Sequence, residues 1–145
     1  MPTPWGYFDT SVVVKRYVPE SGSSLAREVI RRHSFLSSAI APLETVSALS
    51  RRRRSGEVDQ NTFNSIVSRI ELDRAHWELV PIDREVLERA ERIVRNLSIR
   101  SLDAIHIASA LSFQERFGNR IPFFSADERQ LDAAAGAGLQ VQRVG

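Results

Sequence analysis

The sequence predicts a three-layer α/β/α sandwich with a central, mainly parallel sheet. Short apolar stretches alternate with helical patterns along the whole chain, which is typical of α/β folds. These stretches lack the polar alternation of half-exposed strands, as expected when helices cover both faces of a parallel sheet. The 145 residues, 42% of them hydrophobic, suit one domain with a sizeable core. We find no linker or repeat, so residues 1–145 are interpreted as a single domain.

The first half of the chain is expected to supply two strands and four helical segments. Pro19 stops the helical turns after the first strand, although residues 12–14 could instead extend that strand. The helix that opens around Pro42 is expected to bury Leu43 and Leu49. In order, we expect a strand ending near Asp9, helical turns over residues 13–17, a helix over 23–33, a strand over 35–38, and helices over 41–54 and 59–76.

The second half of the chain repeats the alternation. Asp83 precedes a run of apolar residues at helical spacing, which is the clearest helical pattern in the sequence. The expected order is a strand over 77–82, helices over 84–97 and 101–117, a strand over 121–124, a helix over 128–135 and a last strand over 139–141.

The helix over residues 101–111 is apolar on nearly every side, which indicates a buried helix. It nevertheless carries Asp103 in its first turn. Burying a carboxylate is costly unless a cation, a metal or several donors compensate it. Asp103 could simply interact with its own helix dipole behind a Ser101 cap, so the positions of the other acids decide between the two interpretations.

Four acids are expected near one edge of the sheet, where ligands bind in open parallel sheets. Asp9 and Asp127 follow the first and fourth strands, and Glu44 lies in the first turn of the helix after the second strand. The place of Asp103 is inferred rather than forced, because its helix follows another helix. Each acid alone could be a turn residue, a cap or a dipole partner. Four together would repel one another without a cation.

Carboxylates without a histidine–cysteine cluster suit Mg²⁺ or Mn²⁺, which can activate water for attack at phosphorus. This chemistry predicts phosphodiester hydrolysis. An aspartyl-phosphate mechanism would want a second aspartate at the position of Ser11, and a receiver domain would want a late lysine, whereas Lys15 is early. His106 follows Asp103 by three residues and could flank the site, but we interpret it as a core histidine.

Composition restricts the function only in part. The chain has no cysteine, which excludes disulfides and thiolate chemistry and is compatible with the cytoplasm. It has neither a signal-peptide pattern nor a membrane-length apolar run, so we expect a cytoplasmic protein without a membrane partner. The net charge of +2 says little about nucleic acid, and the preference for arginine over lysine is explained as well by codon bias.

Each of the four acids lies in a short segment of its own: residues 8–11, 43–49, 101–111 and 124–127. These segments resemble the acidic motifs of PIN-domain ribonucleases, and within them the VapC-type toxins of bacterial toxin–antitoxin pairs. The resemblance covers nearly the whole chain. The third motif is the most specific, and the fourth has serine where threonine is common.

The resemblance implies a metal-dependent endoribonuclease in which Asp9, Glu44, Asp103 and Asp127 hold one or two Mg²⁺ or Mn²⁺ ions. It implies that Ser125, with Thr10 or Ser11, orients the site by hydrogen bonds. It also implies a homodimer and a VapB-like antitoxin that inserts into the acidic cleft.

An RNA substrate also requires basic residues outside the acidic cluster. The candidates are Lys15 with Arg16, and the strip Arg51, Arg52, Arg53 and Arg54, which could equally be a solvated helix end. Two alternatives stay open: a PIN nuclease of RNA maturation that has no antitoxin, and a catalytically idle PIN-like binding module.

Overall fold

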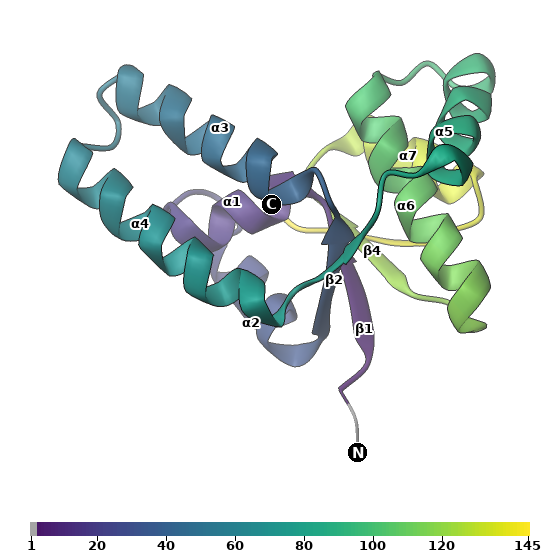
Figure 1. The fold of residues 1–145 in the computed structure, drawn as a ribbon, viewed down its shortest axis with the longest axis horizontal. Helices are drawn as coiled ribbons and strands as arrows, with labels where there is room; N and C mark the ends of the chain where they lie inside the picture. The colour runs from purple at the N-terminus through teal and green to yellow at the C-terminus, as the bar shows by residue number, and fades with distance from the viewer. Residues whose placement is uncertain (1–2) are drawn as a thin grey trace.

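The computed structural model describes residues 3–145 and contains a five-stranded sheet with the strand order β3-β2-β1-β4-β5 (Figure 1). Every neighbouring pair of strands is parallel. The α/β/α class predicted from the sequence is confirmed, and the sheet is parallel throughout. The strands are β1 (Trp5–Phe8), β2 (Ser34–Ser38), β3 (Glu78–Val80), β4 (Pro122–Ser125) and β5 (Gln140–Arg143).

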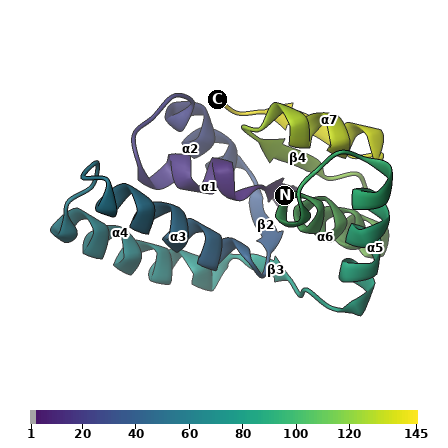
Figure 2. The same cartoon turned by 90° about the horizontal axis from the view of Figure 1, so that it is seen from above.

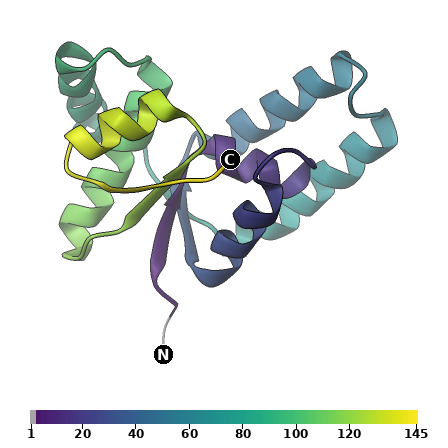
Figure 3. The ribbon, with the colours of Figure 1, turned by 180° about the vertical axis from the view of Figure 1, so that it is seen from behind.

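Helices cover both faces of the sheet. The first four lie on one side and the last three on the other, as the front and back views show (Figures 1 and 3). Seen from above, α3 and α4 lie side by side as an arm that projects from the body (Figure 2). The helices are α1 (Thr10–Tyr17), α2 (Ser23–Arg32), α3 (Ala41–Arg54), α4 (Gln60–Asp73), α5 (Arg84–Asn96), α6 (Ser101–Phe117) and α7 (Glu128–Gly136), with a 3-10 turn at Arg74–His76. In residues 3–145, no helix is both long and apolar enough to span a membrane.

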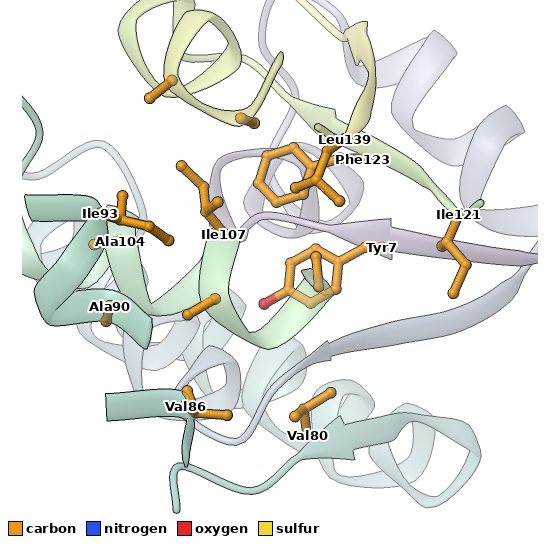
Figure 4. Close-up of a cluster of buried hydrophobic side chains, with 14 of the residues drawn as sticks. Tyr7, Val80, Val86, Ala90, Ile93, Ala104, Ile107, Ile121, Phe123 and Leu139 are labelled. Atoms are coloured by element: carbon orange, nitrogen blue, oxygen red, sulfur yellow. The ribbon is translucent and has the colours of Figure 1, made fainter. Parts of the chain in front are cut away.

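Alternate residues of the central strands supply two separate cores. Tyr7 and Phe123 face α5, α6 and α7, where they pack with Ile107 (Figure 4). Phe8 and Phe124 face α1 and α2 on the other side. Burial of each such side chain stabilises the fold by about 1.5–3 kcal/mol, so both faces of the sheet contribute.

A row of stacked rings crosses the sheet on the α1–α2 face. The ring centroids of Phe124 and Phe8 are 5.0 Å apart, those of Phe8 and Phe35 5.2 Å, and those of Phe35 and Trp77 4.5 Å. Gly6 lies beneath this row, where a Cβ atom would meet Phe124 and His33 at 3.0 Å. A side chain at position 6 would therefore require His33 and the Phe124 ring to shift.

Some predicted boundaries differ from the structure. Residues 12–14 are helical, because α1 begins directly after Asp9. The helix expected over 59–76 ends as α4 at Asp73 and tightens into the 3-10 turn, and the third and last strands cover 78–80 and 140–143.

Two leucines expected to be buried are exposed. Leu43 is 67% exposed and Leu102 is 45% exposed, so neither α3 nor the first turn of α6 is covered at these positions. The prediction of a buried helix after residue 101 is wrong for Ser101 and Leu102, which are exposed, and right for Ala104, Ile107 and Ala108.

The chain reverses its direction of winding at the centre of the sheet. From β1 it moves outward to β2 and β3, and it then returns to place β4 on the other side of β1. Ligand sites in open parallel sheets form at the carboxyl ends of strands beside such a point. The ends of β1 and β4, after Phe8 and Ser125, therefore mark where a site is expected.

Candidate active site

Asp9 is the first residue after β1 and caps the start of α1. Its Oδ2 accepts hydrogen bonds from the Ser11 backbone N–H at 3.0 Å and from the Ser11 hydroxyl at 2.6 Å. Its Oδ1 accepts from the Gln130 side-chain amide at 2.9 Å. The residue is 6% exposed, so its carboxylate is held by protein donors rather than by bulk water.

Asp127 is the second residue after β4 and caps the start of α7. Its Oδ1 accepts from the backbone N–H groups of Arg129 and Gln130, as an N-cap aspartate does. The Ser125 hydroxyl accepts from the Asp127 backbone N–H at 3.0 Å. Asp9 and Asp127 thus stand at the ends of neighbouring strands, each fixed by a helix N-terminus.

Glu44 lies in the first turn of α3 and faces two polar side chains. Its Oε1 accepts from the Thr10 hydroxyl at 2.7 Å and lies 2.6 Å from Nε2 of His106. His106 is 1% exposed, and its Nδ1 lies 2.8 Å from the Tyr7 hydroxyl. These distances fit an imidazole that accepts at Nδ1 and donates at Nε2.

The electrostatics of His106 follow from these neighbours. Burial of the ring lowers its pKa, but the charges of Asp9 and Glu44 and the hydrogen bond to Glu44 outweigh burial and raise that pKa above its usual value. Nε2 lies 3.6 Å from Oδ1 of Asp9. His106 is thus a buried core histidine with both nitrogens engaged, as predicted, and it also contacts two of the predicted site acids.

Asp103 lies in the first turn of α6 and is less constrained. Its Oδ2 lies 3.8 Å from the Arg100 guanidinium, which is itself largely exposed. Burial, and after it the negative charges of Asp9 and Asp127, raise the pKa of Asp103 above its usual value. Asp103 is therefore close enough to Asp9 and Asp127 for their negative charges to disfavour its ionised form.

The four predicted acids line one cleft of about 560 Å³. Thr10 and Ser11 also line it, whereas Ser125 lies beneath it, wholly buried. Exposed Leu43 and Leu102 stand among its lining residues and give an acidic cleft an apolar margin.

The predicted basic residues divide into two groups. Lys15, Arg51 and Arg52 line the cleft. The Lys15 ammonium and the Arg52 guanidinium both contact Glu20, which the sequence analysis did not single out. Arg51 is exposed and bonds to Ser47 within its own helix.

The other predicted basic residues point elsewhere. Arg16 pairs with Asp73 at 3.4 Å. The Arg53 guanidinium lies over the Phe63 ring, 4.2 Å from its centroid, and Arg54 bonds to Ser50. None of Arg16, Arg53 and Arg54 lines the acidic cleft.

Gln130, like Glu20, is a residue at the site that the sequence analysis missed. It is wholly buried in α7, although it sits only three residues after Asp127. A polar residue at a core position of a helix is the signal that could have identified it, because buried polar groups need partners.

The donor chemistry of the cleft fits a hard divalent cation, because carboxylate and hydroxyl oxygens are the ligands that Mg²⁺ and Mn²⁺ prefer. The present rotamers do not enclose such an ion. In the part of the chain described here, no three His, Asp or Glu side chains are grouped so that they could hold a metal. The carboxylates that line the cleft and could approach a cation are those of Asp9, Glu44, Asp103 and Asp127, and Glu44 is turned toward Thr10 and His106.

Comparison with known proteins gives a consistent result. The PIN domain profile matches residues 6–136. Ribonuclease VapC45 of Mycobacterium tuberculosis (strain CDC 1551 / Oshkosh) and Ribonuclease VapC49 of Mycobacterium tuberculosis (strain ATCC 25618 / H37Rv) are each 32% identical over 110 residues, which are 75% of this chain and 76% of theirs.

Two solved structures share the fold. A toxin-antitoxin complex from Klebsiella pneumoniae aligns with a TM-score of 0.62 at 12% identity, covering 87% of this chain and 89% of that chain. VapBC-5 from Mycobacterium tuberculosis, a member of the VapBC family of toxin-antitoxin systems, aligns with a TM-score of 0.55 at 18% identity, covering 99% and 98%. With the profile match and the 32% identical relatives, the acidic cleft at the ends of β1 and β4 places this chain in the PIN-domain family, among its VapC-type ribonucleases.

Proposed function

We propose that the chain is a divalent-metal-dependent endoribonuclease and the toxin of a VapBC-type toxin–antitoxin pair. The observation that carries this proposal is the gathering of Asp9, Glu44, Asp103 and Asp127 around one cleft. The curated relatives, which are named ribonucleases, support the substrate. We propose that the protein acts in the cytoplasm. The chain has no cysteine, so it does not depend on an oxidising compartment for disulfide formation.

The four acids would hold one or two Mg²⁺ or Mn²⁺ ions, and bound metal would supply an activated water and stabilise charge at phosphorus. The protein's own part is orientation. Ser11 fixes Asp9 and Thr10 fixes Glu44, each by a hydroxyl hydrogen bond of 2.6–2.7 Å. Ser125 acts from below by accepting the Asp127 backbone N–H. We assign no covalent nucleophile.

Among the three basic residues that line the cleft, Arg51 is the best placed to contact an RNA phosphate. It lines the cleft and is exposed, whereas Lys15 and Arg52 are engaged with Glu20. A phosphate contact positions the strand without reading its sequence, so this residue would raise affinity for RNA in general.

The proposed partner is a VapB-like antitoxin that occupies the cleft. An acidic cleft with Leu43 and Leu102 at its margin is complementary to a segment that carries both cationic and apolar side chains. The solved toxin-antitoxin proteins that share the fold support such a partner. We also propose a homodimer, which light scattering on the purified chain would test.

The decisive experiment compares the wild-type protein with Asp103→Asn on a panel of purified RNAs, in Mn²⁺, in Mg²⁺ and in chelator. We expect cleavage that requires metal and is lost in the variant, because the substitution removes one carboxylate and keeps the shape of the side chain. Cleavage that survives either change would exclude the four-acid mechanism. A folded wild-type protein that binds metal but cuts no RNA would favour the idle binding module.

The neighbouring gene distinguishes the two nuclease hypotheses. A short open reading frame for a DNA-binding antitoxin is expected beside a toxin. A PIN nuclease of RNA maturation would have no such neighbour and would be insensitive to a cognate inhibitor.

A further inference from the structure

Gln130 occupies a position in α7 where its amide reaches across the sheet edge to Asp9. We propose that Gln130 is a positioning residue, which fixes the Asp9 carboxylate in the orientation needed to bind the divalent cation. This inference rests on the proposed function. It is carried by the complete burial of Gln130 and by hydrogen bonds at both ends of its amide.

The hydrogen-bond network determines which way the amide faces. The Asp127 backbone N–H donates to the Ser125 hydroxyl oxygen, which leaves the Ser125 hydroxyl proton free to donate to Oε1 of Gln130 at 2.6 Å. The Gln130 Nε2 group must then face Oδ1 of Asp9, at 2.9 Å. The opposite amide orientation would place a carbonyl oxygen against the carboxylate, which offers no donor.

Gln130 fixes the oxygen of Asp9 that Ser11 does not. Both Ser11 donors bond to Oδ2 of Asp9, whereas the Gln130 amide bonds to Oδ1. Replacing Gln130 would therefore remove a hydrogen bond that Ser11 does not supply. An ionised carboxylate has about four acceptor positions, and three are taken by these donors. About one acceptor position of the Asp9 carboxylate then remains for a ligand in the cleft. The hydrogen bond from Gln130 fixes the direction of that remaining position.

The same amide joins two acids that are distant in the sequence. Through Ser125, the chain of hydrogen bonds runs from the backbone N–H of Asp127, which follows β4, to the carboxylate of Asp9, which follows β1. The two carboxylates belong to different strands and different helix caps. Gln130 therefore contacts both acids, since its side-chain amide donates to the Asp9 carboxylate and its backbone N–H donates to Oδ1 of Asp127 at 3.3 Å.

Methionine at position 130 separates this role from simple packing. It has a volume close to that of glutamine and can fill the same space, but it offers Asp9 no N–H donor and gives Ser125 only a weak acceptor. Gln114 provides a matched control in α6. Its Oε1 accepts the Ile121 backbone N–H at 2.9 Å, and it does not line the acidic cleft.

The test measures Mn²⁺ binding to the full chain without RNA, by calorimetry, together with unfolding in urea. We expect Gln130→Met to weaken Mn²⁺ affinity about 10- to 100-fold, the usual effect of losing a residue that orients a metal ligand. Gln114→Met should leave Mn²⁺ affinity unchanged although it too loses an internal hydrogen bond. RNA cleavage by Gln130→Met should recover in part at high Mn²⁺ concentration.

Ser125→Ala supplies a second variant, which keeps Gln130 but removes the donor that orients it. Its loss of Mn²⁺ affinity should largely disappear in the Gln130→Met background, because the two residues act in one chain of bonds. If wild-type protein binds Mn²⁺ and Gln130→Met binds it within twofold, or if the two losses add fully, the inference is wrong. If wild-type protein neither binds Mn²⁺ nor cuts RNA, the proposed function itself fails, and this inference fails with it.

Discussion

Tyr7→Phe tests whether the buried hydroxyl of β1 supports the site through His106. Burial raises the pKa of Tyr7 well above its usual value, so the hydroxyl remains protonated and available as a donor. The substitution keeps the ring, which stacks on Phe123 with centroids 5.2 Å apart, and leaves no cavity. It removes the 2.8 Å contact with Nδ1 of His106, which is 1% exposed.

The expected loss follows from the partner that remains. An imidazole nitrogen left buried without a hydrogen bond costs about 1–3 kcal/mol. Taking about 2 kcal/mol as the fall in the free energy of unfolding, the melting temperature of a chain of this size should fall by about 4–8 °C. Because His106 also contacts Glu44 at 2.6 Å, a loosened ring should weaken Mn²⁺ binding as well.

The assay is urea unfolding of wild type, Tyr7→Phe and Tyr17→Phe. Tyr17 donates to Asp73 at 2.6 Å in a part-buried contact that water can replace, so its loss should be smaller. An equal or larger loss in Tyr17→Phe, or an unchanged free energy of unfolding in Tyr7→Phe, would refute the argument from burial.

Two further predictions concern the charged side of the cleft. Arg51→Glu should weaken RNA binding and reduce the slope of log affinity against log salt concentration by about 0.7, the value for one lost phosphate contact. Arg54 is exposed but lies outside the cleft, so Arg54→Glu should change the affinity and the slope less. RNA-binding titrations at several salt concentrations measure both quantities. Burial raises the pKa of Glu20, but the hydrogen bonds and charges of Arg52 and Lys15 outweigh burial and lower it, so Glu20 stabilises the fold above its ordinary pKa of 4.5. Glu20→Gln should therefore cost about 1–2 kcal/mol of unfolding free energy at neutral pH, and the gap should close as the pH falls below 4.5; equal losses at acidic and neutral pH would contradict this.

The spacing of apolar residues, together with the residues that end or cap helices, was sufficient to predict the layers of this fold. Strands without polar alternation required helices on both faces, and the structure places Tyr7 and Phe8 in opposite cores accordingly. The same reasoning placed Asp9 and Asp127 at strand ends, because strand ends follow from where apolar runs stop. The position of Asp103 did not follow in this way, since α6 is preceded by α5 rather than by a strand.

Contacts between distant residues were beyond the reach of periodicity. Leu43 has the spacing of a buried residue, yet it lies at the cleft margin, where no element covers it. Arg51 and Arg54 are three residues apart in one basic run, but α3 turns them to different surroundings. A polar residue at a core position of α7 indicated that Gln130 needs a partner, but only the structure shows that this partner is Asp9. The local sequence pattern determines which side of a helix or strand is apolar, whereas tertiary packing determines which residues that side contacts.

The structural and proposed chemical roles of these acids are compatible, although the sequence presented them as alternatives. Asp9 and Asp127 are helix caps, as the simpler interpretation held, and both also line the acidic cleft. A cap consumes part of one carboxylate and in doing so holds the side chain in one rotamer. The lone pairs that remain are then aimed by the backbone of α1 and α7 rather than by flexible side chains. Capping is therefore a means of preorganising the proposed metal ligands, and the hydrogen bonds of Ser11, Ser125 and Gln130 extend it across the strand ends.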